Sequence, residues 1–163
     1  MEKNQTIKTH EDAPDFTLED QNGRRFKLSD FKGKKVLLSF HPLAWTPVCS
    51  KQMKSLEDNK ERLDAAKTVA VGISVDSVPS KNAWAKDLGI EHTRLLADFW
   101  PHGGVSQTYG LFYDKDGFSM RANVIIDENQ QVAWVKVYPT PHVPDINEVL
   151  RVLQDMQITS GTG

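Results

Sequence analysis

The chain has 163 residues, of which 39% are apolar and 26% are charged, and its net charge at pH 7 is −2. This length suits one domain with a full hydrophobic core, and the composition excludes a wholly disordered or fibrous chain. The near-neutral balance argues against a nucleic-acid surface, and no apolar run approaches the roughly 18 residues that a membrane-spanning helix needs. We therefore expect a single domain over residues 1–163, with no nucleic-acid partner and no membrane partner.

The two ends of the chain differ from its middle. Residues 1–12 and 159–163 are mostly polar and show no periodicity, so we expect both ends to be mobile. The N-terminal stretch lacks the apolar centre of a signal peptide, and a single cysteine cannot form an internal disulfide. Both observations predict a cytoplasmic protein.

Hydrophobic periodicity predicts the elements of the first half of the chain. The stretch DFTLEDQNGRRFKLSD alternates apolar and polar residues around Asn22-Gly23, which predicts a β-hairpin. KKVLLSF and VAVGISV are short apolar runs, typical of central strands that are covered on both faces. Between these runs, residues 46–67 have apolar side chains at helical spacing and predict one long amphipathic helix.

The second half continues the alternation of helices and strands. Pro79 and Gly89 mark the start and the end of a helix, RLLADF predicts a third strand, and a short helix is expected around residues 105–109. RANVIID and VAWVKVY predict an antiparallel pair, and DINEVLRVLQDM predicts a terminal helix capped by Asp145. This order predicts an α/β protein with a thioredoxin-like fold: a central mixed β-sheet flanked by helices, with an added N-terminal β-hairpin.

The only cysteine, Cys49, follows a predicted buried strand within HPLAWTPVCSKQM. If Thr46 is the N-cap, Pro47 takes the first helical position and Cys49 lies in the first turn. Unpaired backbone N–H groups and the helix dipole favour a thiolate there, and such surroundings lower a cysteine pKa from about 8.5 to roughly 3.5–7.5. The spacing alone leaves two interpretations open, a reactive thiol and a small buried apolar residue. A dithiol oxidoreductase is excluded because no Cys-x-x-Cys occurs.

Several motifs, in the same order along the chain, resemble the peroxiredoxin (AhpC/TSA-like) family. PLAWTPVC matches the pattern Pro-x-x-x-Thr-x-x-Cys, APDFTLEDQNG is similar to the opening hairpin, and RANVIIDENQQVAWV resembles the strand that carries the family's arginine. The lone thiol resembles the one-cysteine type, and the length and HPLAWTPVC are closest to the AhpE-like group. The resemblance implies a thioredoxin-like fold and a thiol-dependent peroxidase that reduces hydrogen peroxide or organic hydroperoxides.

The resemblance also implies roles for particular residues. Cys49 would be the peroxidatic cysteine, Thr46 and Arg121 its partners, and Pro42 the residue that shields the sulfur. The Thr46 hydroxyl would accept a hydrogen bond from the peroxide and donate one to the thiolate. Many members carry glutamate at the position of Gln52. The amide of Gln52 removes that negative charge near the sulfur. We expect the substrate pocket to include Trp45, Val48, Gln52 and His41.

No cofactor and no metal are expected. The five histidines are dispersed, and one cysteine is too few for any familiar zinc spacing. The pair Gly103-Gly104 lacks the lysine and the spacing of a phosphate-binding loop.

The single thiol also limits the partners. A sulfenic acid on Cys49 has to be reduced by an external thiol, which could be a small thiol, thioredoxin or glutaredoxin. A rival hypothesis is a peroxide sensor or redox relay that passes oxidation to a partner with little turnover, and a purely structural thioredoxin-like domain is a third. Related proteins often form dimers, so we expect a homodimer, with Trp84 and Phe99 as candidate contacts, although burial in the core explains these two residues equally well.

Overall fold

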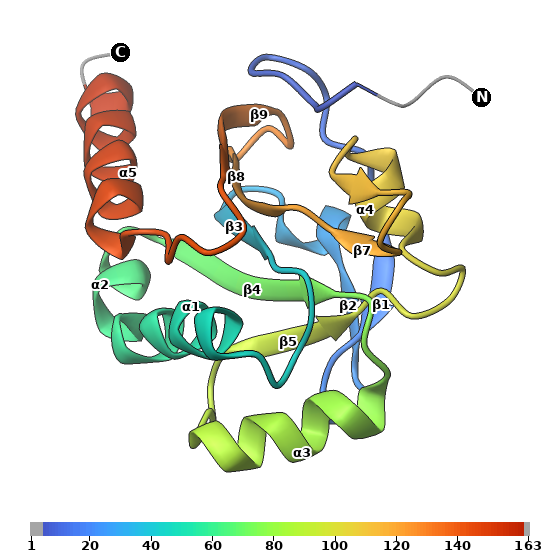
Figure 1. Cartoon of the computed structure of the whole chain (residues 1–163). Coiled ribbons are helices and arrows are strands. Elements are labelled where there is room, and N and C mark those ends of the chain that lie inside the picture. The colour runs from blue at the N-terminus through green and yellow to red at the C-terminus, as the bar shows by residue number, and fades with distance from the viewer. Residues whose placement is uncertain (1–4, 162–163) are drawn as a thin grey trace.

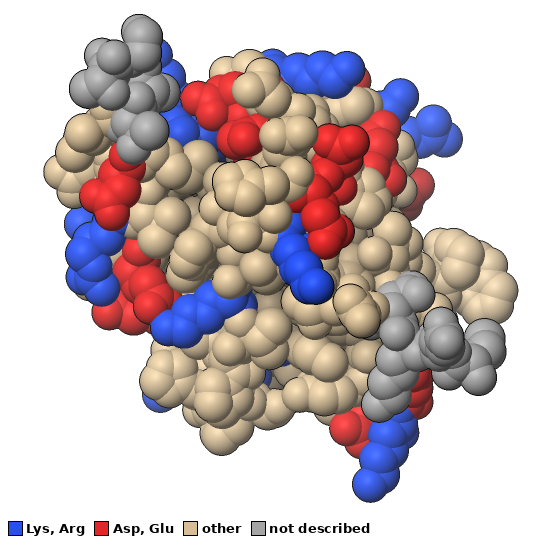
Figure 2. Space-filling view, turned by 90° about the horizontal axis from the view of Figure 1, so that it is seen from above, with Lys and Arg blue, Asp and Glu red and all other residues tan. Residues whose placement is uncertain are grey.

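The protein is described here by a computed structural model, which covers the backbone of residues 5–161 and the side chains up to residue 158. Residues 1–4 and 162–163, where we expected mobile ends, lie outside the described residues. No helix in the described part is long and apolar enough to cross a membrane. Figure 2 shows acidic and basic side chains interspersed on the face that it presents.

The described strands form one large sheet and one small ribbon. The strands are β1 (Thr17–Glu19), β2 (Arg25–Lys27), β3 (Lys35–Phe40), β4 (Thr68–Ser74), β5 (Arg94–Ala97), β6 (Phe112–Tyr113), β7 (Phe118–Ser119), β8 (Arg121–Ile126) and β9 (Val132–Tyr138). Within residues 5–161 the large sheet has seven strands in the order β2-β1-β5-β4-β3-β8-β9, and β6 pairs with β7. β3, β4 and β5 are parallel, and the other pairs are antiparallel. The predicted mixed sheet with an N-terminal hairpin is therefore confirmed.

Helices cover both faces of this sheet (Figure 1). They are the 3-10 turn η1 (Leu28–Phe31) and α1 (Pro47–Asp58), α2 (Lys60–Ala65), α3 (Val78–Leu88), α4 (Gly104–Thr108) and α5 (Ile146–Gly161). Alternate residues of β3 point to opposite sides, as the pleat requires. Leu38 packs with Phe26 and Tyr109 in one apolar cluster, whereas Leu37 packs with side chains of α1, α2, α3 and α5 in the other. The second cluster also contains Cys49, so the thiol lies on the side of the sheet covered by four helices.

The long helix expected over residues 46–67 is wrong, because the structure divides it at Asn59. The backbone of Asn59 has φ −108° and ψ 18°, which departs from helical values. Its side-chain amide donates a hydrogen bond of 2.8 Å to the carbonyl of Ser55, which also accepts from the backbone N–H of Asn59 at 3.2 Å. α1 therefore ends at Asp58, and α2 begins at Lys60 as a separate short helix.

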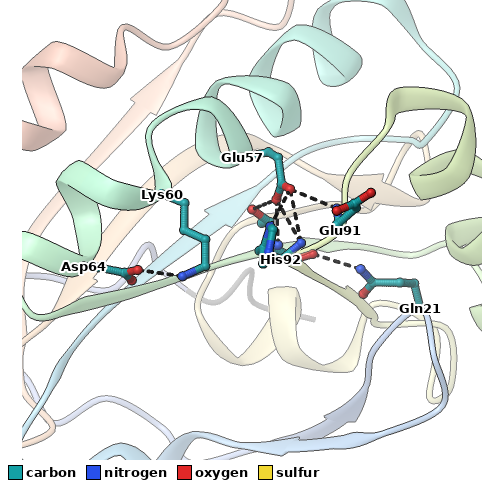
Figure 3. Close-up of polar contacts among 7 residues, drawn as sticks. Gln21, Glu57, Lys60, Asp64, Glu91 and His92 are labelled. Carbon is teal, nitrogen blue, oxygen red and sulfur yellow. Dashed lines mark hydrogen bonds and ion pairs between the residues drawn. The ribbon is translucent and has the colours of Figure 1, made fainter.

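Glu57, near the end of α1, joins this helix to the segment that leads into β5 (Figure 3). Its carboxylate accepts hydrogen bonds from the backbone N–H groups of Glu91, His92 and Thr93, at 2.8–3.2 Å. Burial alone would raise the pKa of Glu57, but hydrogen bonds from the backbone of Glu91 and Thr93 and from the side chains of Thr93 and His92 lower it to about 2. The ionised carboxylate thereby fixes the position of α1 against the sheet.

Part of the N-terminal segment that we expected to be mobile is attached to the body of the fold. Ile7 is 6% exposed, and its N–H donates to the carbonyl of Tyr109 at 3.1 Å. The N–H of His10 donates to the carbonyl of Val132 at 2.8 Å. Backbone pairing and burial of one apolar side chain thus hold residues 5–12, which the polar composition did not indicate.

Candidate active site

The backbone that leads into α1 places the thiol in a first helical turn. Thr46 is the N-cap residue with an extended backbone, and Pro47 takes the first helical position, as predicted. Trp45, just before them, has a φ of 70°, in the left-handed region that few residues other than glycine adopt. Cys49 follows in the first turn and is 0% exposed. The sulfur is therefore a buried group at the positive end of a helix.

Arg121 contacts the sulfur directly. It is the first residue of β8, and β8 pairs with β3, the strand that leads into the cysteine loop. Its side chain is 3% exposed, and Nη1 donates to Cys49 Sγ at 3.2 Å. The same nitrogen donates to Gln52 Oε1 at 2.7 Å, and Nε donates to the carbonyl of Thr140 at 2.8 Å. The guanidinium group is thus held at three points, with one nitrogen on the sulfur.

Gln52 orients this arginine and is itself oriented by the sheet. It is 1% exposed, and its amide donates to Ser39 Oγ at 2.7 Å and to the carbonyl of Phe40 at 3.1 Å. The Ser39 hydroxyl donates in turn to Asn123 Oδ1 at 2.8 Å, across the register pair of β3 and β8. Because the Ser39 oxygen and the Phe40 carbonyl both accept from the NH2 group of Gln52, the oxygen end of the amide faces Arg121. Gln52 was expected to line a pocket, but the structure makes it a buried link between α1, β3 and β8.

Thr46 differs from the role that the resemblance implied. Its hydroxyl donates to the carbonyl of Leu43 at 2.8 Å, and its side chain does not cap the helix. A hydroxyl has one proton to donate, so Thr46 does not donate to the sulfur in this geometry. Arg121 supplies the hydrogen bond to Cys49 instead, and the oxygen of Thr46 remains able to accept one.

The remaining predicted residues surround the loop between β3 and α1. Pro42 is buried and Val48 is half-buried. Trp45 is 51% exposed, and its indole N–H donates to Ser80 Oγ at 3.1 Å, so the side chain lies at the surface beside α3. Packing in the core, the ordinary role of a tryptophan, is therefore not its role here.

His41 is fully buried, and its ring makes two polar contacts. Its Nδ1 lies 3.3 Å from the carbonyl of Ser39, and its Nε2 lies 3.1 Å from Nζ of Lys81. Its ring stacks at a tilt on Trp84, with 5.5 Å between the centroids. Lys81 and Trp84, both on α3 and both 0% exposed, were not predicted as site residues. Within the described part of the chain no three His, Cys, Asp or Glu side chains gather in a way that could hold a metal ion.

Comparison with known proteins identifies the family. Residues 9–135 match the model of the AhpC/TSA family. The chain belongs to this family. The alkyl hydroperoxide reductase E of Mycobacterium tuberculosis is 37% identical to it over 134 residues, which cover 82% of this chain and 87% of that protein. Peroxiredoxin 2 of Thermoplasma acidophilum is 36% identical over 150 residues, 89% of this chain and 74% of that protein.

Two solved structures share the fold of this chain. A reduced 2-Cys peroxiredoxin of Plasmodium vivax has a TM-score of 0.83 and 29% identity, over 92% of this chain and 82% of that one. AhpC of Enterococcus faecalis has a TM-score of 0.86 over 94% of both chains, and at 21% identity this likeness concerns the fold alone. Family membership makes this chain a thiol-dependent peroxidase, and its single cysteine is consistent with the one-cysteine type.

Proposed function

We propose that Cys49 is the peroxidatic cysteine, which reduces hydrogen peroxide or organic hydroperoxides and is recycled by an external thiol. The observation that carries this assignment is the Arg121 guanidinium, whose Nη1 lies 3.2 Å from the sulfur of a fully buried cysteine. A buried cation and a helix N-terminus both favour the thiolate, which is the nucleophilic form.

The reaction follows from this geometry. The thiolate of Cys49 attacks one peroxide oxygen, an S–O bond forms and the O–O bond breaks. The sulfur is oxidised to sulfenic acid, and the departing oxygen leaves as hydroxide or alkoxide, which is protonated by an acid of the solvent to give water or an alcohol. Arg121 stabilises the negative charge on the sulfur and on the departing oxygen, because its guanidinium group stays charged and presents several donors.

The other predicted residues take supporting roles in this proposal. Thr46 accepts a hydrogen bond from the peroxide hydroxyl, which its remaining lone pairs allow. Pro42 shields the sulfur, while Val48 and Trp45 form the rim through which the peroxide enters. His41 is buried and lies against the ring of Trp84. Because Cys49 is 0% exposed, side chains of this loop move aside to admit the substrate.

The assignment is tested by mixing reduced protein with hydrogen peroxide in a stopped-flow instrument, with tryptophan fluorescence as the signal. Cys49→Ser is measured alongside, and intact mass is taken at the end. We expect a fast signal that is absent in the variant and ends with added oxygen on Cys49. Peroxide consumption by Cys49→Ser at the rate of the native protein would overturn the assignment. Fast oxidation without steady-state turnover on added thiols would favour the sensor hypothesis over the peroxidase.

The same proposal includes a reductant, a cellular location and a homodimer. One cysteine in the chain requires an external reductant, which is a small thiol, thioredoxin or glutaredoxin. A lone reduced thiol suits a cytoplasmic location.

For a homodimer, Trp84 is ruled out as a contact because it is fully buried, whereas Phe99 and Trp100 are 47% and 81% exposed. A monomer in light scattering at micromolar concentration would contradict the dimer.

A further inference from the structure

Lys81 is a buried cation, and no carboxylate of the described residues is in contact with it. Its side chain is 0% exposed, and none of the ion pairs among the described side chains includes it. Its Nζ instead lies 3.1 Å from Nε2 of His41, whose Nδ1 lies 3.3 Å from the carbonyl of Ser39. Burial, and then the charges of Lys81 and Arg121, lower the pKa of His41 well below its usual value, so the ring is neutral. Nδ1–H then donates to Ser39, and Nε2 accepts from the ammonium group.

This cation shares its surroundings with the peroxidatic sulfur. The centroid of the Trp84 ring lies 5.5 Å from the centroid of the His41 ring. It also lies 5.6 Å from Nζ of Lys81. The indole N–H of Trp84 donates at 3.2 Å to the hydroxyl of Ser50, the residue after Cys49. Trp84 and Cys49 also belong to the same buried cluster. A single layer of packed side chains therefore connects the ammonium group to the first turn of α1.

A buried ammonium group is costly unless negative charges surround it. Burial lowers the pKa of Lys81 to about 7, and the negative charges of Asp76, Cys49 and Asp98 act in the opposite direction. Asp76 and Asp98 each already accept two hydrogen bonds from other groups. Of the three anions, only the thiolate is formed and consumed during the reaction.

We propose that Lys81, oriented by the neutral ring of His41, is a positioning residue of the peroxidatic site whose buried positive charge stabilises the Cys49 thiolate. It acts through the field inside the protein, in addition to the direct hydrogen bond from Arg121. This inference rests on the proposed function of Cys49. The interaction is reciprocal, so the thiolate also favours the charged form of Lys81.

Lys81→Met tests the inference, since methionine keeps the unbranched stem and removes the charge. The measurement is the pH dependence of two second-order rate constants, for alkylation by iodoacetamide and for oxidation by hydrogen peroxide. We expect the pH midpoint of both profiles to rise by about one unit, with up to about tenfold slower reaction below the midpoint and an unchanged plateau above it. A purely structural lysine would lower the plateau without moving the midpoint.

Lys35→Met is the matched control. Lys35 is 4% exposed and lies at the opposite end of β3, about 20 Å of strand away from His41, so its loss should leave the midpoint unchanged. A second measurement does not require Lys81→Met to fold. The NMR titration of the Lys81 side chain, with ¹³C at Cε, should move to lower pH in Cys49→Ser than in the native protein.

The outcomes separate the two proposals. An unmoved midpoint in Lys81→Met, or the same Lys81 titration in the native protein and in Cys49→Ser, would refute the role of Lys81. In either case native protein that still consumes peroxide through Cys49 leaves the peroxidase assignment intact. Peroxide consumption that persists in Cys49→Ser would instead overturn the assignment on which the inference rests.

Discussion

Replacing Gln52 by glutamate tests the neutral amide that this chain places beside Arg121. The Gln52 amide group donates to Ser39 Oγ and to the carbonyl of Phe40, while its oxygen accepts from Arg121. A carboxylate would keep the contact with Arg121 but would place a second acceptor against the Phe40 carbonyl, 3.1 Å away. The Ser39 hydroxyl cannot compensate while it donates to Asn123.

The magnitude follows from the position of the new charge. Gln52 Oε1 and Cys49 Sγ lie 2.7 Å and 3.2 Å from the same nitrogen of Arg121, so they are at most about 6 Å apart. At an effective dielectric constant of about 20, two negative charges at that distance repel by about 3 kcal/mol, which corresponds to about two pH units. The guanidinium group between them offsets part of this repulsion. We expect the pH midpoint of thiolate formation to rise by one to two units in Gln52→Glu.

The assay is the absorbance of the thiolate at 240 nm during a pH titration, together with the rate of oxidation by hydrogen peroxide at pH 7. Gln154→Glu, at an exposed position of α5, adds the same charge to the molecule and serves as the control. Gln52→Glu should also unfold at a lower denaturant concentration, since each buried acceptor left unsatisfied costs about 1–3 kcal/mol. An unmoved midpoint in a folded Gln52→Glu would refute the reasoning.

Three further substitutions follow from contacts in the structure. Arg121→Lys keeps the positive charge but loses the forked arrangement of guanidinium N–H donors. One hydrogen bond to a charged group contributes about 1.5–3 kcal/mol, so oxidation measured by stopped flow should slow by roughly 10- to 100-fold. The circular dichroism spectrum should stay unchanged. Glu57→Gln removes a carboxylate whose pKa is lowered to about 2, so the native protein should exceed the variant in urea stability by roughly 3 kcal/mol above about pH 5, and the two should converge as the pH falls towards 2. A Cβ added at Gly72 would lie 3.2 Å from His41 Cε1 and in direct overlap with Met53 Sδ, so Gly72→Ala should lose about 1–3 kcal/mol in denaturant titrations.

Local patterns were sufficient to predict the elements that carry the site. The apolar run of β3 indicated a strand covered on both faces, and all six of its residues are buried. Pro47 in the first helical position indicated where α1 begins, and this placed Cys49 in the first turn. Each pattern involves only residues that are close together in the sequence, so it can be recognised without knowledge of the fold. The break at Asn59 was missed because it depends on the backbone angles of one residue, which no periodicity indicates.

The polar network around Arg121 could be predicted only in part. Ser39 and Asn123 are polar residues inside apolar strands, which indicates a buried hydrogen-bonding network. That these two residues face each other depends on the register of β3 and β8, and periodicity along one strand does not determine register. The donation by Thr46 to Leu43 likewise depends on the backbone of Trp45, whose positive φ no residue type there indicated.

The charges at the site also explain why a buried lysine is compatible with this fold. Gln52 adds no negative charge beside Arg121, so among the described side chains the ionised Cys49 is the anion in contact with this guanidinium group. A buried ammonium group lowers stability, and below pH 7 this cost is fully present because Lys81 is charged in both the folded and the unfolded state. From about pH 7 to 10.5 the unfolded chain binds more protons at this group than the folded protein, so stability at this group rises with pH. The thiolate offsets part of the cost in the reduced enzyme, and oxidation removes that offset because sulfenic acid lacks the thiolate charge. The reduced state, which is ready to react, is therefore the state in which Lys81 is best compensated.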